Sequence, residues 1–324
     1  MISKRQIPDI NLPLMMSTMK KILIATEKPF APIAVQGIRE IAEAAGYELR
    51  LLEKYSDPND LKLAVVDVDA MIIRSDKATR EVLEAGENLK IVVRAGAGYD
   101  NIDTIAATEL GIIAMNTPGQ NSNAVAELVL GMMVFKARNG FDGRAGVELK
   151  GKKLGIHAFG NVGQLVAKIA LGFSMDVYAY DPFINAEKIE SAGVKPVGTV
   201  GELYATCQYI SLHIPANEQT RNSIGKGLLS SMPDGAVLVN TARKEVIHED
   251  ELQEVMESRS DFTYLSDIAP ACAAIFEEKY QGRFFFTPKK MGAQTSEANI
   301  NAGMAAAAQI RDFFEKGDIR FKVN

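Results

Sequence analysis

Short apolar runs alternate with longer helix-like segments along almost the whole chain, and this alternation constrains the fold more than any other feature. Continuous apolar runs bounded by turn residues are typical of parallel strands that are covered on both faces. The first series of runs is 21–26, 48–52, 71–74, 91–94 and 112–116. The second series is 154–159, 177–181, 209–214, 237–241, 262–267 and 284–287. Because six strands with intervening helices match a complete dinucleotide-binding sheet, we predict an α/β fold of two Rossmann-like doubly wound domains with a cleft between them.

The two series also predict where the domains divide. The apolar helical segment 123–139 separates them, and a second helix, 297–316, follows the last run. A lone amphipathic helix must bury its apolar face, so we expect 297–316 to pack back on the first domain. The predicted domains are 20–117 plus 298–324, and 118–297. Residues 1–19 make a poor signal peptide, because Pro13 interrupts their apolar stretch, and we interpret them as an extension.

Charge and cysteine content exclude several classes of protein. The formal net charge is -5 and no long basic run is present, so neither a nucleic acid nor an anionic membrane surface is expected as the main partner. No apolar run approaches the roughly 18 residues that span a bilayer. The two cysteines, Cys207 and Cys272, lack metal-ligand spacing and form no disulfide framework. We therefore expect no metal site and a reducing, cytoplasmic compartment.

The turn at 158–163 connects a strand to a helix and carries most of a dinucleotide-binding fingerprint. Gly160 would let the backbone approach a pyrophosphate, and Gly163 would let the helix pack closely on the strand. Ala158 stands at the first glycine position, where a methyl group requires a negative φ. The free N–H groups of the helix start would face the phosphates. The predicted contacts are Gly160, Asn161, Val162 and Gly163.

Asp181 ends the next strand, 18 residues after Gly163. A carboxylate at this place accepts hydrogen bonds from the adenosine ribose and repels a 2′-phosphate, so we predict NAD rather than NADP. The alternatives are an ordinary helix-start turn for the glycines and a strand-end turn residue for Asp181.

Longer motifs resemble those of the D-isomer-specific 2-hydroxyacid dehydrogenases, and the resemblance covers nearly all of 20–324. They are 91–103 (IVVRAGAGYDNID), 116–119 (NTPG), 125–127 (VAE), 211–215 (SLHIP) and 239–243 (VNTAR). The resemblance implies hydride transfer between NAD and a small anionic 2-hydroxy acid. It is strongest for the shorter members that oxidise 3-phospho-D-glycerate to 3-phosphohydroxypyruvate for serine synthesis. Another D-2-hydroxy acid, an NAD-binding corepressor-like protein and a pseudoenzyme are the alternatives.

The same resemblance assigns a role to each residue of the site. Arg243 corresponds to the catalytic arginine, whose guanidinium can bind a carboxylate while it polarises the 2-oxo group. Arg74 corresponds to a phosphate-binding residue, with a solvated strand-end charge as the alternative. His213 is expected to be a structural donor rather than the acid–base group. The further cofactor residues are His213, Pro215, Thr241, Ala242 and Asp267, and the substrate residues are Arg74, Ser75, Arg94, Gly96, Ala97, Gly98 and Asn116.

The histidine and glutamate that form the family's acid–base pair are both missing. Cys272 stands at the position of the glutamate, and Thr287-Pro288 is followed by lysines instead of a histidine. We expect Lys289 to be the acid–base group, with Lys290 as the alternative if the register slips by one residue. A lysine needs partial burial and a nearby cation to lower its pKa, and a carboxylate would oppose this. An inactive enzyme is the other interpretation.

The resemblance also implies a homodimer formed through the 123–139 helix. Longer relatives carry a serine-binding domain at their C-terminus, whereas this chain ends at Asn324. We therefore expect no inhibition by L-serine.

Overall fold

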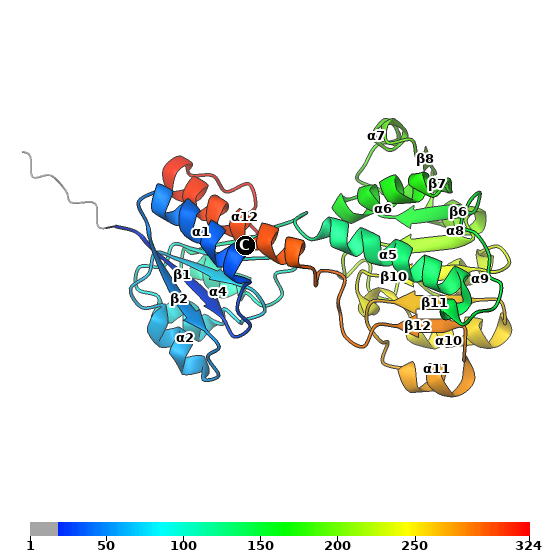
Figure 1. The fold of residues 1–324 in the computed structure, drawn as a ribbon, viewed down its shortest axis with the longest axis horizontal. Coiled ribbons are helices and arrows are strands. Elements are labelled where there is room, and N and C mark those ends of the chain that lie inside the picture. The colour runs from blue at the N-terminus through cyan, green and yellow to red at the C-terminus, as the bar shows by residue number, and fades with distance from the viewer. Residues whose placement is uncertain (1–18) are drawn as a thin grey trace, which may run out of the picture.

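The computed structural model describes residues 19–324, which form two α/β units joined by two crossings of the chain (Figure 1). The extension expected at 1–19 lies, apart from Met19, outside the described residues. Every strand pair in both sheets is parallel, as continuous apolar runs predict. The predicted α/β class with two Rossmann-like sheets is therefore confirmed.

The first sheet contains the five predicted strands in the order β2-β1-β3-β4-β5. The strands are β1 (Lys21–Thr26), β2 (Glu48–Glu53), β3 (Ala70–Ile73), β4 (Ile91–Arg94) and β5 (Ile113–Asn116). The helices around it are α1 (Pro32–Ala44), α2 (Pro58–Ala64), α3 (Arg80–Ala85), α4 (Thr104–Glu109) and α12 (Ser296–Lys316).

The second sheet has seven strands within residues 19–324, in the order β12-β11-β10-β9-β6-β7-β8. They are β6 (Lys153–His157), β7 (Asp176–Tyr180), β8 (Lys195–Pro196), β9 (Tyr209–Leu212), β10 (Val237–Asn240), β11 (Thr263–Ser266) and β12 (Phe284–Phe286). The sequence predicts six of them and misses β8, because two residues that include a proline make no recognisable apolar run.

The helical segments of this second unit are α5, α6, α7, α8, α9, α10, α11 and two short 3-10 turns, η1 and η2. Their bounds are α5 (Ser122–Ala137), η1 (Asn139–Phe141), α6 (Asn161–Gly172), α7 (Ala186–Ser191), α8 (Val200–Thr206), α9 (Lys226–Ser231), η2 (Lys244–Val246), α10 (Glu249–Ser258) and α11 (Ala273–Lys279).

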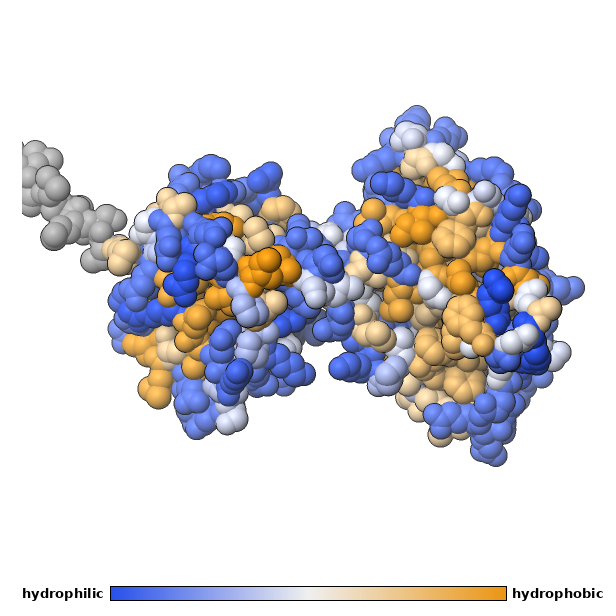
Figure 2. Space-filling view, in the orientation of Figure 1, coloured by the Kyte–Doolittle hydropathy of each residue, from blue (hydrophilic) through white to orange (hydrophobic). Residues whose placement is uncertain are grey.

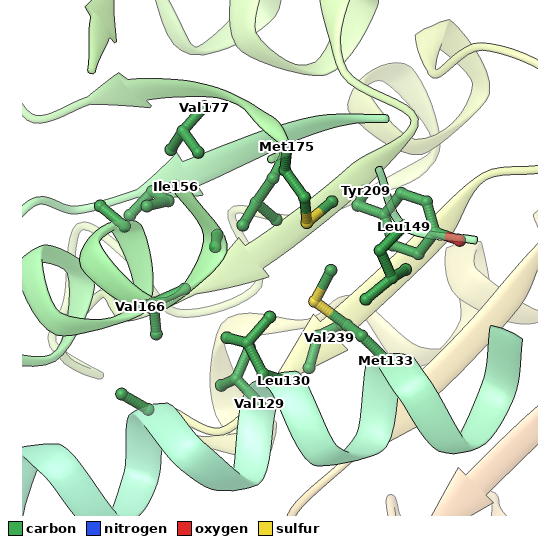
Figure 3. Packing of buried hydrophobic residues seen from close by; sticks show 14 of the residues in the cluster. Val129, Leu130, Met133, Leu149, Ile156, Val166, Met175, Val177, Tyr209 and Val239 are labelled. Carbon is green, nitrogen blue, oxygen red and sulfur yellow. The ribbon is translucent and has the colours of Figure 1, made fainter. Parts of the chain in front are cut away.

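Helices α5 and α6 cover one face of this sheet. Figure 3 shows Val129, Leu130 and Met133 of α5 turned toward Val166 of α6 and Ile156 of β6. These side chains belong to one buried apolar cluster, which fixes α6 against the strand that precedes it. The turn between β6 and α6 is thereby held at the edge of the sheet.

The chain crosses between the units after β5 and returns at α12, which packs on α1 in the first unit (Figure 1). Thr295 caps α12 by accepting a hydrogen bond from Ala298 N at 3.1 Å, and Gly317, with φ 66°, ends it. A Cβ on Gly303 would lie 3.0 Å from Ile38 Cδ1, so the two helices approach closely at this glycine. The first turn of α12 therefore stands at the crossing, and the rest of the helix belongs to the first core.

None of the helices in the described part of the chain is long and apolar enough to cross a membrane.

Candidate active site

Four cationic side chains from both units meet where the units face each other. Arg74 follows β3, Arg94 ends β4, Arg243 follows β10 and Lys290 follows β12, and we call these four residues the cation cluster. Burial, followed by the charges of Arg243 and Arg74, lowers the pKa of Arg94, while Asp100 opposes the shift. Burial, followed by the charge of Arg243, lowers the pKa of Lys290 to about 8. Each member therefore lies within electrostatic range of another, as expected for a site that binds an anion.

The buried side chain of Asn240 shapes the loop that carries Arg243. Asn240 Oδ1 accepts from Ala242 N at 3.0 Å, and its Nδ2 donates to Arg243 O at 3.0 Å. Arg243 Nη2 lies 4.0 Å from Asp100 Oδ1 of the first unit. Sequence reasoning gave Asn240 no role, although it stands inside the 239–243 motif. The arrangement lets Arg243 reach across to the loop that follows β4.

The glycine loop at 96–98 faces two of these arginines. Gly96 has φ 153°, and a Cβ there would lie 1.7 Å from Arg94 Nη1, so only glycine fits. A Cβ on Gly98 would lie 3.1 Å from Arg243 Nη2. Asn116 Nδ2 donates to Ala97 O at 2.6 Å, so this predicted substrate residue supports the loop, and its Oδ1 accepts no hydrogen bond from the described residues.

Neutral oxygen atoms hold the guanidinium of Arg74. Nη1 donates to Lys28 O at 3.1 Å and to Pro29 O at 3.2 Å, and Nη2 donates to Asn299 Oδ1 at 2.6 Å. Burial lowers the pKa of Arg74. These contacts argue against a freely solvated strand-end charge. Ser75, by contrast, is exposed and forms no hydrogen bond within residues 19–324.

The contacts favour Lys290 over Lys289 as the acid–base candidate. Both side chains keep access to solvent, but only Lys290 has a defined partner among the described residues: its Nζ donates to Ala242 O at 2.6 Å. Arg243 Nη1 donates to the same carbonyl oxygen at 3.1 Å. The loop therefore turns the second lysine, and not the one directly after Pro288, toward Arg243.

Asp267 is fully buried, and it shapes the loop that presents Lys290. Its Oδ1 accepts from Met291 N at 2.8 Å and from Thr287 Oγ1 at 3.1 Å. Its Oδ2 accepts from Gly292 N at 2.8 Å. The sequence predicts Asp267 as a cofactor residue, and every hydrogen bond that its carboxylate accepts within residues 19–324 comes from the 287–292 loop. These contacts show that Asp267 holds the 287–292 loop in its conformation.

His213 lies beside the site as a neutral group. Its Nε2 is 2.9 Å from Ser211 Oγ, and burial, followed by the charge of His157, lowers its pKa to about 3. An imidazole of this kind carries no proton to donate as imidazolium near neutral pH. The contacts therefore favour a structural role.

Cys272 faces a carboxylate at the start of α11. Its backbone N donates to Glu249 Oε2 at 3.0 Å, and burial, followed by the charge of Glu249, raises the pKa of its thiol to about 12. The thiol is therefore neutral at physiological pH and adds no negative charge that would raise the pKa of a lysine.

The turn from β6 to α6 fits a bound pyrophosphate. A Cβ on Gly160 would meet no atom within 4 Å, whereas one on Gly163 would lie 2.3 Å from Ala158 O. No side chain caps the start of α6, so its first N–H groups are free to bind an anion. The expectation for Ala158 is wrong, because its φ is 80°. The turn keeps the conformation that a glycine would adopt at that position, with a methyl group added.

Asp181 ties the end of β7 to the same turn. Its Oδ2 accepts from Phe159 N and its Oδ1 from Phe183 N, both at 2.8 Å. A carboxylate oxygen has two lone pairs, so both oxygens can still accept from ribose hydroxyls. Thr241 Oγ1, which is buried two residues before Arg243, has no partner within the described residues. The residues present therefore fit NAD.

Comparisons with known proteins agree with this geometry. Residues 129–272 match the family model described as D-isomer specific 2-hydroxyacid dehydrogenase, NAD binding domain. Hydroxypyruvate reductase from Thermotoga maritima is 35% identical over 280 residues, which cover 81% of this chain and 90% of that protein. The crystal structure of NAD+-bound 3-phosphoglycerate dehydrogenase from Entamoeba histolytica is 50% identical, with a TM-score of 0.84, and the match covers 94% of this chain and 99% of that one.

A longer relative matches over only part of its length. D-3-phosphoglycerate dehydrogenase from Methanocaldococcus jannaschii is 36% identical over 319 residues, which cover 90% of this chain but 57% of that protein. The chain thus spans little more than half of this curated relative. The chain is 35% and 50% identical to two of these relatives over most of its length, and this shows that the protein belongs to the D-isomer specific 2-hydroxyacid dehydrogenases. The matched family model shows that its second unit contains the family's NAD-binding domain.

Proposed function

We propose that this protein oxidises 3-phospho-D-glycerate to 3-phosphohydroxypyruvate with NAD. The observation that carries the proposal is the cation cluster, which gathers four positive groups in a chain whose formal net charge is -5. A phosphorylated 2-hydroxy acid carries about three negative charges, from one carboxylate and one phosphate. Burial, followed by repulsion within the cluster, lowers the pKa values of Arg94 and Lys290, and a substrate of this charge would offset the repulsion.

The two ends of such a substrate would bind different members of the cluster. Arg243 and the N–H groups of Ala97 and Gly98 would hold the carboxylate, since a guanidinium binds a carboxylate through two parallel hydrogen bonds. The N–H of Gly96 already donates to Arg94 O at 2.9 Å. Arg74 would hold the phosphate at the far end, with Arg94 between them. Arg94 Nε donates to Arg74 O at 3.0 Å, which keeps these two arginines adjacent.

Lys290 is the proposed acid–base group. In the oxidation its neutral amine takes the proton of the C2 hydroxyl, and the C2–O bond becomes a carbonyl that Arg243 polarises. When bound, NAD accepts the hydride that leaves C2. Because its pKa is lowered to about 8, both the neutral amine and the ammonium form of Lys290 are populated near neutral pH. In the reduction the ammonium returns the proton to the carbonyl oxygen.

We assign substrate binding to 20–117 with 298–324, and cofactor binding to 118–297. The start of α6 would hold the pyrophosphate through Gly160, Asn161, Val162 and Gly163, and Asp181 would bind the ribose. Both cysteines of the chain are free, which supports a reducing compartment such as the cytoplasm.

A second substrate, hydroxypyruvate, is favoured by the similarity to the reductase from Thermotoga maritima. It differs from 3-phosphohydroxypyruvate only by the phosphate, so a comparison of the two substrates measures what the phosphate contributes to kcat/KM. We expect NADH oxidation to show a kcat/KM at least tenfold higher for 3-phosphohydroxypyruvate than for hydroxypyruvate, and higher still than for glyoxylate or pyruvate, because Arg74 adds a charge-assisted contact. Equal rates with and without the phosphate would overturn the proposal, and no oxidation of NADH with any of them would indicate a pseudoenzyme.

We also propose that two copies associate through the α5 side of the second unit. Most residues of α5 are apolar, and Leu128 and Val134 on this helix are incompletely buried. Figure 2 shows apolar side chains gathered over this side of the unit. Phe141 and Val147, which follow α5, are 66% and 55% exposed. The exposed positions of α5 are Asn123, Glu127 and Gly131, and the partly exposed apolar side chains beside them suit a self-complementary two-fold contact.

A further inference from the structure

Asn299 lies in the first turn of α12 and contacts an arginine that is 225 residues away in the sequence. Its Oδ1 accepts from Arg74 Nη2 at 2.6 Å, and its Nδ2 donates to Thr295 O at 2.8 Å. A guanidinium only donates and a backbone carbonyl only accepts, so the two contacts together fix which end of the amide faces Arg74. The same turn is capped by Thr295. The start of α12 is thus built to present an amide oxygen to Arg74.

We propose that Asn299 is a positioning residue for phosphate recognition: it orients Arg74 without neutralising it, so that the guanidinium charge stays available to the phosphate of the substrate. The proposal rests on the proposed function, in which Arg74 binds that phosphate. It adds a residue of the returning helix to a site otherwise built by the loops after the strands.

The chemistry of the partners of Arg74 supports this role. The three acceptors of its guanidinium are Lys28 O, Pro29 O and Asn299 Oδ1, and all three are neutral. The guanidinium also lies over the ring of Phe30, 5.0 Å from its centroid. The buried Asp76 accepts from the backbone N of Arg74 at 3.4 Å, and its charge only partly opposes the effect of burial, which lowers the pKa of Arg74. The guanidinium itself forms no ion pair within residues 19–324, so it is oriented by neutral groups and left charged.

The donors that remain match a phosphate. A guanidinium has five N–H groups, and three contacts leave two. Two donors suffice for a bidentate bond to phosphate oxygens, provided that the plane of the guanidinium is fixed. Arginine has several rotamers, and holding one of them in advance removes an entropic cost of binding. Asn299 supplies the only side-chain acceptor for the guanidinium of Arg74 among the described residues, so it is the contact that a substitution can remove.

The position of Asn299 also links two parts of the site. Residues 287–292 carry Lys290, and α12 begins a few residues later, where the chain crosses back to the first unit (Figure 1). The proposed phosphate-binding arginine is therefore attached to the segment that follows the proposed acid–base loop. A residue at this place can affect the recognition of the phosphate without contacting the reacting carbon.

Two substitutions test the proposal in opposite ways. Asn299→Ala removes the acceptor and frees Arg74. Asn299→Asp keeps an acceptor of the same shape but adds a negative charge, which pairs with Arg74 and competes with the phosphate. Asn301 provides the matched control, because its side chain is exposed on the same helix and forms no hydrogen bond within residues 19–324. Asn301→Ala and Asn301→Asp therefore report the effect of the same changes on α12 alone.

The experiment measures kcat and KM for NADH-dependent reduction of 3-phosphohydroxypyruvate and hydroxypyruvate by the full chain. We expect Asn299→Ala to raise KM for the phosphorylated substrate about tenfold, as the loss of one charge-assisted contact would. Asn299→Asp should raise the KM for the phosphorylated substrate further. In both Asn299 variants, kcat and the KM for hydroxypyruvate should stay within about twofold of wild type. Both Asn301 variants should match wild type. Thermal unfolding of each variant reports whether it is folded, and Asn299→Asp, which can pair with Arg74, should unfold at or above the wild-type temperature.

A double-mutant cycle with Arg74→Ala tests whether Asn299 acts through the arginine. If it does, Arg74→Ala/Asn299→Ala will be no worse than Arg74→Ala alone. Equal effects of Asn299→Ala on both substrates, or additive effects in the cycle, would overturn the proposal. If wild type shows no preference for the phosphorylated substrate, the proposed function fails. If wild type shows the preference and Arg74→Ala abolishes it while both Asn299 variants retain it, only the role of Asn299 fails.

Discussion

At the scale of single residues, Lys289 and Lys290 form a natural matched pair. Lys290→Ala should lower kcat by roughly 10²–10⁴, the usual value of general acid–base help, and leave the affinity for NADH nearly unchanged. Lys289→Ala should do little, because its ammonium has no partner among residues 19–324. Lys290→Arg keeps the positive charge but cannot lose its proton in the accessible pH range, so it should be as inactive as the alanine variant. Full kcat in both alanine variants would place the proton donor elsewhere.

The pKa of Lys290 also predicts how activity changes with pH. The oxidation needs the neutral amine, so kcat/KM, which reports the free enzyme, should rise as the pH passes through about 8. The reduction needs the ammonium, so its kcat/KM should fall over the same interval. The rise in the oxidation profile and the fall in the reduction profile should both be missing in Lys290→Ala. Profiles of the two directions in wild type and variant check this prediction, and limbs that persist in the variant would contradict it.

Ala158 is strained by its own side chain. Its φ of 80° lies in the left-handed region, which costs an alanine roughly 1–2 kcal/mol. Ala158→Gly should therefore raise the free energy of unfolding by about 1 kcal/mol, less the extra chain entropy of glycine in the unfolded state. Denaturant unfolding measures this change in the free energy of unfolding. Gly160→Ala is the control: its φ is -76° and its Cβ would meet no atom within 4 Å, so the free protein should be no less stable while NAD binding weakens.

At the scale of the elements, Asp181 connects β7 to the turn that begins α6. Asp181→Ala removes the negative charge and also the acceptors for Phe159 N and Phe183 N. Asp181→Asn removes the charge but keeps one acceptor oxygen. Both variants should narrow the preference for NADH over NADPH in kcat/KM, and the alanine variant should lose more stability, because the asparagine still accepts one of the two backbone hydrogen bonds. Equal use of both cofactors by wild type would show that Asp181 does not select the cofactor.

The order of strands and helices is predictable from the sequence, because apolar runs and turn residues record it directly. The missed elements have physical reasons. Strand β8 is two residues long and contains Pro196, so it leaves no pattern. The positive φ of Ala158 is imposed by the turn, in which Ala158 N donates to Tyr180 O at 2.9 Å. Periodicity reports which residues are buried, but it does not report backbone strain.

The site is predictable in its arginines and less so in its supporting residues. Arg74, Arg94 and Arg243 follow strands that motifs place at one edge of each sheet. The choice between Lys289 and Lys290 depends on the turn that Asp267 fixes through Met291 N and Gly292 N, and no local pattern contains that turn. The contact of Asn299 with Arg74 could not be anticipated either, because 225 residues separate them and the fold alone brings them together.

At the scale of the whole molecule, the distribution of charge explains how an acidic protein can bind an anion. The formal net charge is -5, yet three arginines and a lysine converge where the two units face each other. Asp100 lies 4.0 Å from Arg243 and is the acidic side chain that most offsets the repulsion on Arg94. A local positive field inside a negative molecule would attract the small anionic substrate that we propose.

Association of two copies is the last property of the whole molecule that the structure lets us test. Gly131 is an exposed residue of α5, and a Cβ there would meet no atom within 4 Å. Replacing a helical glycine by a longer residue favours the helix, so Gly131→Glu should leave the single chain folded. In a two-fold contact through α5 it would add two carboxylates to those of the exposed Glu127 on the same face, where their repulsion and desolvation are costly. We expect sedimentation velocity to give a dimer for wild type and a monomer for Gly131→Glu, with unchanged circular dichroism. Gly227→Glu, on α9, is the control, since a Cβ there is equally unobstructed, and it should remain dimeric. A dimeric Gly131→Glu would place the interface on another surface, and a monomeric wild type would exclude the proposed association.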